Sequence, residues 1–130
     1  MNTKIIMTSS ALVLGISGLA LTFMPDELLL YLKLPLEKNI ELLLQILGAL
    51  YFAFGMTNWM SKDTLIGGIY NRPIAIGNMT HFMMVAIASF KLLVSGSEYP
   101  DFLWVLSGIY GLFALLFGLI LFKTPKLGAS

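Results

Sequence analysis

Four long apolar stretches, separated by short polar segments, dominate the pattern of the chain. They cover residues 5–24, 40–60, 74–94 and 102–122. Each is close to the ~20 residues that an α-helix needs to cross a hydrocarbon layer of ~30 Å. Strands of a membrane β-barrel need only ~10 residues with alternating polarity, which these stretches lack. The pattern predicts an all-α, polytopic membrane protein with four transmembrane helices in a compact antiparallel bundle, forming one membrane domain over residues 1–130.

The segment between the first two stretches predicts a short additional helix. Pro25, Asp26 and Glu27 suit the first turn of a helix, because proline fits there and acids complement the helix dipole. The apolar run 28–34 is too short to cross a bilayer, and Pro35 ends it. We therefore expect a short interfacial helix after the first span.

Composition agrees with a lipid environment and excludes several function classes. The chain is 58% hydrophobic and only 12% charged, whereas soluble domains carry roughly 25% charged residues. The net charge is +1 and the cations are dispersed, so no nucleic-acid partner is expected. The absence of cysteine excludes disulfides and thiol chemistry. Lys4 before an apolar run also fits a signal peptide, but the length of the run favours a retained span.

The basic residues predict the orientation of the chain. One side of the membrane would hold Lys4, Lys62, Arg72, Lys123 and Lys126. The other side would hold Lys33, Lys38 and Lys91. Because cytoplasmic segments carry an excess of Lys and Arg, both termini are expected in the cytoplasm of a cell whose plasma or inner membrane holds the protein.

Each stretch carries one face of small or polar residues when its positions are placed at 100° intervals. In the first stretch this face holds Ala11, Gly15, Gly18 and Thr22. In the second it holds Glu41, Gln45, Gly48, Phe52, Gly55, Asn58 and Trp59. In the third it holds Asn78, His81, Val85, Ala88 and Ser89, and the opposite face, expected to contact lipid, holds Ile76, Met79, Met83, Ile87 and Phe90. In the fourth it holds Trp104, Ser107, Gly108, Gly111, Leu115 and Gly118. Since small residues let helices approach closely in lipid, we expect these faces to meet.

The only histidine, His81, lies near the middle of the third stretch, with Asn78 one turn away on the same face. An ionisable side chain at that depth is a functional-site hypothesis, because its burial must be compensated. The sharper prediction is a ligand-binding pocket formed by Gln45, Asn58, Asn78 and His81. The alternative, which we favour, is a neutral His81 that joins helices through a hydrogen bond.

Other chemistry finds little support in the sequence. A metal site needs three or four ligands on one polar face, and a catalytic nucleophile needs a base beside it. We therefore expect no metal, no cofactor and no catalytic residue. Arg72, beside Tyr70 and Asn71, is expected to bind a lipid phosphate or to pair with Asp63. The alternative is a topology anchor like any other cation at the membrane boundary.

The run Gly67–Pro73, followed by Gly77–Asn78 and His81–Phe82, gives the chain a layout that resembles uncharacterised small four-span bacterial membrane proteins. In size and helix number the chain also resembles DoxX-type proteins. Some DoxX-type proteins are membrane subunits linked to quinone or thiol redox chemistry, but the resemblance is one of layout and carries no function over to this chain. It implies no site residue, because no diagnostic motif is matched.

Three functions compete on these grounds. The first is a non-enzymatic partner, scaffold or lipid-binding component whose partners are membrane lipids, other membrane subunits or a second copy of itself. The second is a small proton-coupled transporter acting as a homo-oligomer, which usually needs a membrane-embedded carboxylate that is missing here. The third is a lipid- or quinone-linked membrane enzyme with a cavity around His81. We rank them in this order.

Overall fold

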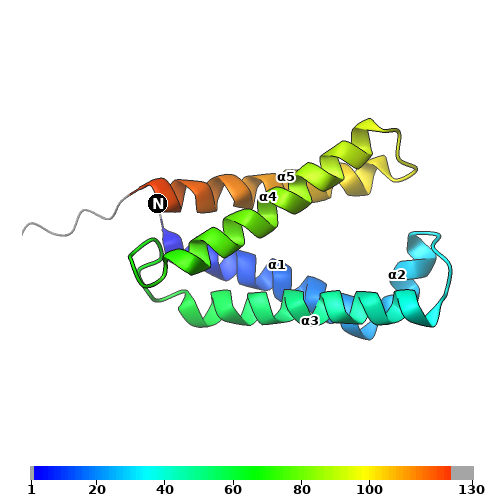
Figure 1. Cartoon of the computed structure of the whole chain (residues 1–130), viewed down its shortest axis with the longest axis horizontal. Helices are drawn as coiled ribbons and strands as arrows, with labels where there is room; N and C mark the ends of the chain where they lie inside the picture. The colour runs from blue at the N-terminus through cyan, green and yellow to red at the C-terminus, as the bar shows by residue number, and fades with distance from the viewer. Residues whose placement is uncertain (1, 124–130) are drawn as a thin grey trace, which may run out of the picture. The chain divides into compact units, whose positions relative to one another are not determined.

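The computed structural model describes residues 2–123, and in this part of the chain it contains five α-helices and no strand (Figure 1). The helices are α1 (Thr3–Phe23), α2 (Pro25–Tyr31), α3 (Lys38–Ser61), α4 (Arg72–Val94) and α5 (Pro100–Phe122). All but α2 are long and apolar enough to cross a membrane. The all-α class, the four long helices and the short helix after the first span are confirmed. We conclude that the chain is a multi-pass membrane protein.

Local signals explain where several helices begin. The Asn2 side chain caps α1, because its Oδ1 accepts a hydrogen bond of 3.1 Å from the Lys4 backbone N–H. A proline lies in the first turn of α2, α4 and α5, where its missing N–H leaves no helical bond unmade. Gly96, with a φ of +86°, reverses the chain between α4 and α5.

The described residues form two compact units, Asn2–Asp63 and 64–123, and each is described by itself. The first contains α1, α2 and α3, and the second contains α4 and α5. Within each unit the two long helices pack side by side in opposite directions (Figure 1). That the chain forms a single membrane domain stays a prediction.

Glycines make the contact between α1 and α3. A Cβ added to Gly18 would lie 2.6 Å from the Phe52 backbone N and 2.8 Å from the Gly48 backbone O. A Cβ added to Gly55 would lie 2.8 Å from the Gly15 backbone N. No ordinary Cβ sits so close to backbone atoms, so only glycine allows this approach. The glycines of the faces predicted for the first two stretches thus meet as expected, whereas Phe52 and Trp59 of the second face are exposed.

Aromatic rings make the contact between α4 and α5. Phe82 of α4 is fully buried, and its ring centroid lies 4.8 Å from that of Phe113, 5.1 Å from that of Tyr110 and 5.9 Å from that of Phe117. Large rings offer more contact area than small residues do, so they decide which faces meet. This cluster of four rings is the core of the α4–α5 unit.

The packing face predicted for the fourth stretch is therefore wrong for its two large residues. Trp104 is 61% exposed and Leu115 is 70% exposed. The buried residues of α5 are instead Leu103, Tyr110, Phe113, Phe117 and Ile120. Ser107 makes the expected contact, since its hydroxyl shares a hydrogen bond of 2.7 Å with that of Ser89. On α4, Asn78 and Ser89 are buried as expected, but the sequence analysis missed Phe82.

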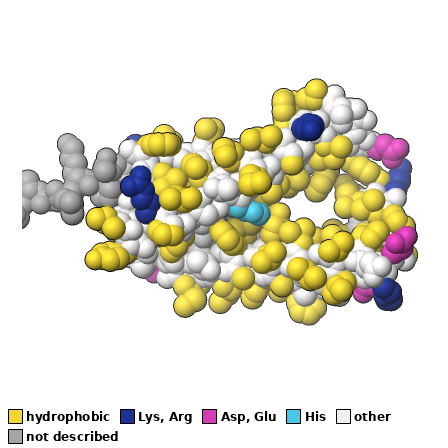
Figure 2. Space-filling view, in the orientation of Figure 1, with side chains coloured by type: hydrophobic (Ala, Val, Ile, Leu, Met, Phe, Trp, Pro, Cys, Tyr) yellow, Lys and Arg dark blue, Asp and Glu magenta, His cyan; other side chains and the backbone are white. Residues whose placement is uncertain are grey.

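Hydrophobic and charged side chains are distributed as a membrane requires. Figure 2 shows hydrophobic side chains along the sides of the helices, whereas most Lys, Arg, Asp and Glu side chains lie near helix ends. Lipid is the solvent that such an exposed apolar surface requires.

Candidate functional site

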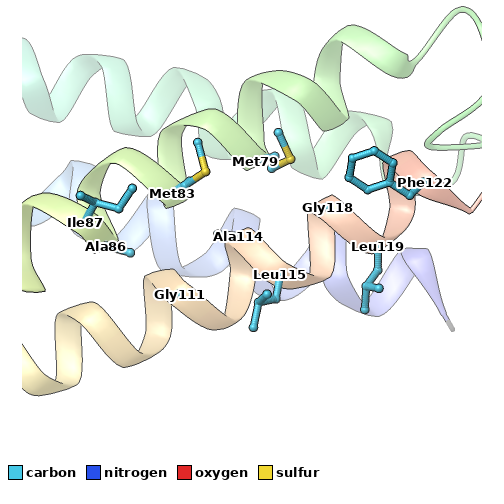
Figure 3. Close-up of a pocket in the computed structure, with 10 residues that line it drawn as sticks. All are labelled: Met79, Met83, Ala86, Ile87, Gly111, Ala114, Leu115, Gly118, Leu119 and Phe122. Carbon is cyan, nitrogen blue, oxygen red and sulfur yellow. The ribbon is translucent and has the colours of Figure 1, made fainter.

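A groove of about 680 Å³ runs between the two helices of the α4–α5 unit (Figure 3). From α4 it is lined by residues that include Met79, Met83 and Ile87. From α5 it is lined by residues that include Gly111, Leu115 and Gly118. Spacings of three, four and seven residues put each set on one face of its helix. Because every lining side chain is apolar or absent, the groove suits an apolar ligand.

Small residues on α5 keep the groove open. A Cβ added to Gly111 would meet nothing within 4 Å, and one added to Gly118 would meet only the Met79 Sδ, at 3.7 Å. The α5 backbone is therefore accessible along this face, while the ring cluster holds the helices together on another face. Met83, which is 42% exposed, forms part of the opposite wall. Methionine is flexible and polarizable, so this wall can adapt to ligands of different shape.

Buried polar side chains in each unit serve helix packing. Asn58 and Ser10 are both fully buried, and the Asn58 Nδ2 donates a hydrogen bond of 3.0 Å to the Ser10 Oγ. The Ser10 hydroxyl in turn donates to the Met7 carbonyl, at 3.0 Å. In the other unit, the Asn78 Nδ2 donates to the Ile74 carbonyl of its own helix, at 2.9 Å. These bonds satisfy buried polar groups within one helix or across one helix pair.

The four residues predicted to share a pocket are divided between the two units. Gln45 and Asn58 lie on α3, thirteen residues and thus about 20 Å apart along the helix axis. Asn78 and His81 lie on α4, where the half-buried His81 ring has its centroid 5.3 Å from that of Phe82 and 5.8 Å from that of Tyr110. None of the four lines the groove. A pocket common to all four stays a prediction.

Charged residues gather at the end where α1 begins and α3 ends. The Lys4 Nζ lies 2.6 Å from the Asp63 carboxylate, and the hydrogen bond and positive charge of Lys4 hold the pKa of Asp63 below its usual value. The Lys62 Nζ lies 3.9 Å from the centre of the Trp59 ring, a cation–π contact. Asp63, the acid considered as a partner for Arg72, is thus paired with Lys4.

Arg72 and Lys123 mark one end of the α4–α5 unit. Arg72 is the first residue of α4, and Lys123 directly follows α5; both are exposed. Since the helices are antiparallel, the beginning of α4 and the end of α5 lie together, as the contact of Gly67 with Ile120 also indicates. Two cations therefore stand at the same end of the hairpin.

Metal ligation has no support in this part of the molecule. Within residues 2–123, no group of three or more His, Asp or Glu side chains is placed to hold an ion. The Glu41 carboxylate, the one acid on the small or polar faces predicted from the sequence, forms an ion pair of 2.9 Å with Lys38 one helical turn away. That pairing accounts for its position at the start of α3.

The groove was not predicted from the sequence. The pattern predicts a helix contact at Gly111 and Gly118 and a lipid-facing position for Met79 and Met83. The available signal was the regular recurrence of Tyr110, Phe113 and Phe117 on one face of α5, which fits a competing packing face.

Comparison of the chain with protein-family models, with curated proteins and with solved structures found no match. The resemblance to DoxX-type proteins stays a prediction.

Proposed function

We propose that the protein is a non-enzymatic membrane component that binds lipid through the groove between α4 and α5. One observation carries the proposal: a groove of about 680 Å³, apolar throughout, lies along two helices that are long and apolar enough to cross a membrane. This volume falls within the ~300–1,000 Å³ usual for ligand sites. A groove on such helices meets acyl chains directly.

The lining favours a lipid chain over a substrate. Enzyme sites combine apolar walls with a few polar groups that orient the reacting bond. The groove offers no such group, so it can bind through contact alone. An acyl chain that fills it gains dispersion contacts along its length. A lipid- or quinone-linked enzyme would need polar groups near the reacting atoms.

The charges also favour binding over transport. Proton-coupled transporters generally use a carboxylate inside the membrane. In the described residues the acids lie at helix ends or in connecting segments, and the interior candidate Glu41 is paired with Lys38. The proton-coupled transporter therefore ranks second.

Lipid retention tests the proposal directly. The full chain, purified from membranes in mild detergent, should carry bound phospholipid in native mass spectrometry. Gly111→Leu should lose most of it, because the added side chain enters the groove without meeting another atom within 4 Å of its Cβ. Gly108→Leu is the matched control: its Cβ also meets nothing within 4 Å, but Gly108 does not line the groove.

Two outcomes would overturn the proposal. The first is equal lipid retention by Gly111→Leu, Gly108→Leu and the natural chain. The second is flux of protons or a solute in proteoliposomes that disappears in His81→Ala while folding is preserved.

A further inference from the structure

We infer that the lipid is an anionic phospholipid, with an acyl chain in the α4–α5 groove and its phosphate bound by Arg72. This inference rests on the proposed function and names the class of lipid. It joins two features of the same unit: the apolar groove and the cations at one of its ends.

The helical register places Arg72 on the groove side of α4. Arg72 precedes Met79 by seven residues, which is two turns less about 20° of rotation. The two residues thus lie on the same face, about 10 Å apart along the axis. Ile76, between them on that face, is also exposed. One exposed stripe therefore runs from the cation to the apolar wall of the groove.

The end of α5 adds a second cation at the same place. Phe122 lines the groove, and Lys123 follows it directly. Gly118 faces Met79 across the groove, so the last turn of α5 lies beside the first turns of α4. A phosphate at this end would meet a guanidinium that can bind it with two hydrogen bonds and an ammonium that adds charge.

The acids of the unit lie at the opposite end. In residues 64–123 the carboxylates are Glu98 and Asp101, both near the turn that joins α4 to α5. No ion pair forms between Arg72 and a carboxylate of residues 2–123. The charge of Arg72 is thus available to an external anion. Among the described residues of the unit, the end that holds Arg72 and Lys123 carries no carboxylate, whereas the other end carries Glu98 and Asp101 together with Lys91. This difference sets the direction in which an anionic lipid binds.

An exposed aromatic side chain marks the expected headgroup level. Tyr70, two residues before Arg72, is 94% exposed, and Ile69 is 85% exposed. Tyrosine is enriched where the hydrocarbon layer meets the headgroups. Arg72 at this boundary can reach a phosphate while the groove receives the attached chain.

A competition between two lipids tests the inference. The full chain in mixed micelles would receive equal amounts of phosphatidylglycerol and phosphatidylcholine with identical acyl chains, and native mass spectrometry would count the adducts. The natural chain should prefer phosphatidylglycerol. Arg72→Gln should lower that preference about fivefold while total lipid retention persists, because one basic residue near anionic lipid contributes about this factor. Arg72→Lys, which keeps the charge but loses the paired donors, should be intermediate.

Lys91→Gln is the matched control, because it removes a cation from the same helix at the end of the unit away from Arg72. It should leave the preference unchanged. Equal losses in Arg72→Gln and Lys91→Gln, or no preference in the natural chain, would overturn the inference while leaving lipid binding intact. Failure of the natural chain to retain any lipid would instead overturn the proposed function.

Discussion

The two helix pairs use glycine in opposite ways. In α1 and α3, Gly18, Gly48 and Gly55 face backbone atoms so closely that a Cβ would collide with them. In α5, Gly111 faces open space and Gly118 faces only the tip of a methionine. The same residue thus makes a contact in one pair and leaves a groove in the other. The two pairs differ because the ring cluster holds α4 to α5 and leaves the glycine face of α5 uncovered.

The largest effect is expected from removing the centre of the ring cluster. Phe82→Ala should destabilise the α4–α5 unit by about 3 kcal/mol, the lower end of the range for loss of a buried ring. The lower end applies because the free energy of transfer from water, which adds to such losses in soluble proteins, is small between helices in lipid. Detergent-induced unfolding followed by tryptophan fluorescence would measure it. Phe90→Ala, at an exposed position on the same helix, is the control. Equal stability of the two variants would remove the ring cluster as the basis of the contact.

The next effect tests the α1–α3 pair, called the closed pair because its glycines are in contact with the facing backbone. Gly18→Ala should destabilise the protein by about 1–3 kcal/mol, because the methyl group would lie 2.6 Å from the Phe52 backbone N, which cannot rotate away. The same unfolding titration applies. A change below about 0.5 kcal/mol, the size expected of a surface substitution, would show that α1 and α3 do not pack as closely as described.

A smaller effect concerns the buried hydrogen bond of the closed pair. Asn58→Leu should destabilise the protein by about 0.6–1.7 kcal/mol, the range for hydrogen bonds between membrane helices. A double-mutant cycle with Ser10→Ala isolates the contribution of the pair. Additive effects of the two substitutions would mean that the bond between Asn58 and Ser10 contributes nothing to stability.

A still smaller effect is expected in the α4–α5 pair, called the open pair because its glycines line a groove. Gly111→Ala should change the free energy of unfolding by less than about 0.5 kcal/mol, since its methyl group meets nothing within 4 Å. Compared with Gly18→Ala in the same titration, it separates a glycine in contact from a glycine in a groove. A loss as large as that of Gly18→Ala would mean that another surface covers the groove.

The smallest effect is a pH dependence at the end of the closed pair. Because Lys4 lowers the pKa of Asp63, the ionised carboxylate stabilises the folded state at pH values above the usual aspartate pKa of ~3.9. That contribution is lost as the pH falls through the lowered pKa. Asp63→Asn should flatten this part of the stability profile. Both side chains are more than half exposed, so the difference is small.

The sequence predicted the closed pair better than the open one. In α1 and α3 the glycines fall on one face of each helix, and these faces make the contact. They are Gly15, Gly18, Gly48 and Gly55. In α5 the glycines compete with Tyr110, Phe113 and Phe117, and aromatic residues suit either lipid or a helix contact. Periodicity alone does not decide between those two environments.

The candidate site was harder to predict for the same reason. A groove between helices depends on which face of each helix turns toward the other, and that followed from the ring cluster. The sequence makes His81 a candidate site residue because it is the only histidine and lies near the middle of a span. The structure places its ring beside Phe82 and Tyr110. Arg72 is a candidate phosphate ligand of the groove because the groove face of α4 continues to it, and the sequence alone does not show that face.

Photocrosslinking with a phospholipid that carries a diazirine on its acyl chain tests the central claim most directly. In bilayers of the full chain, peptide sequencing should find the label at Met83 and Leu115 of the groove, and not at the fully buried Met7 and Leu14 of α1. Gly111→Leu should reduce the label at Met83. Protection of Met83 and Leu115 to the level of Met7 would contradict the account, because it would mean that protein, and not lipid, occupies the groove.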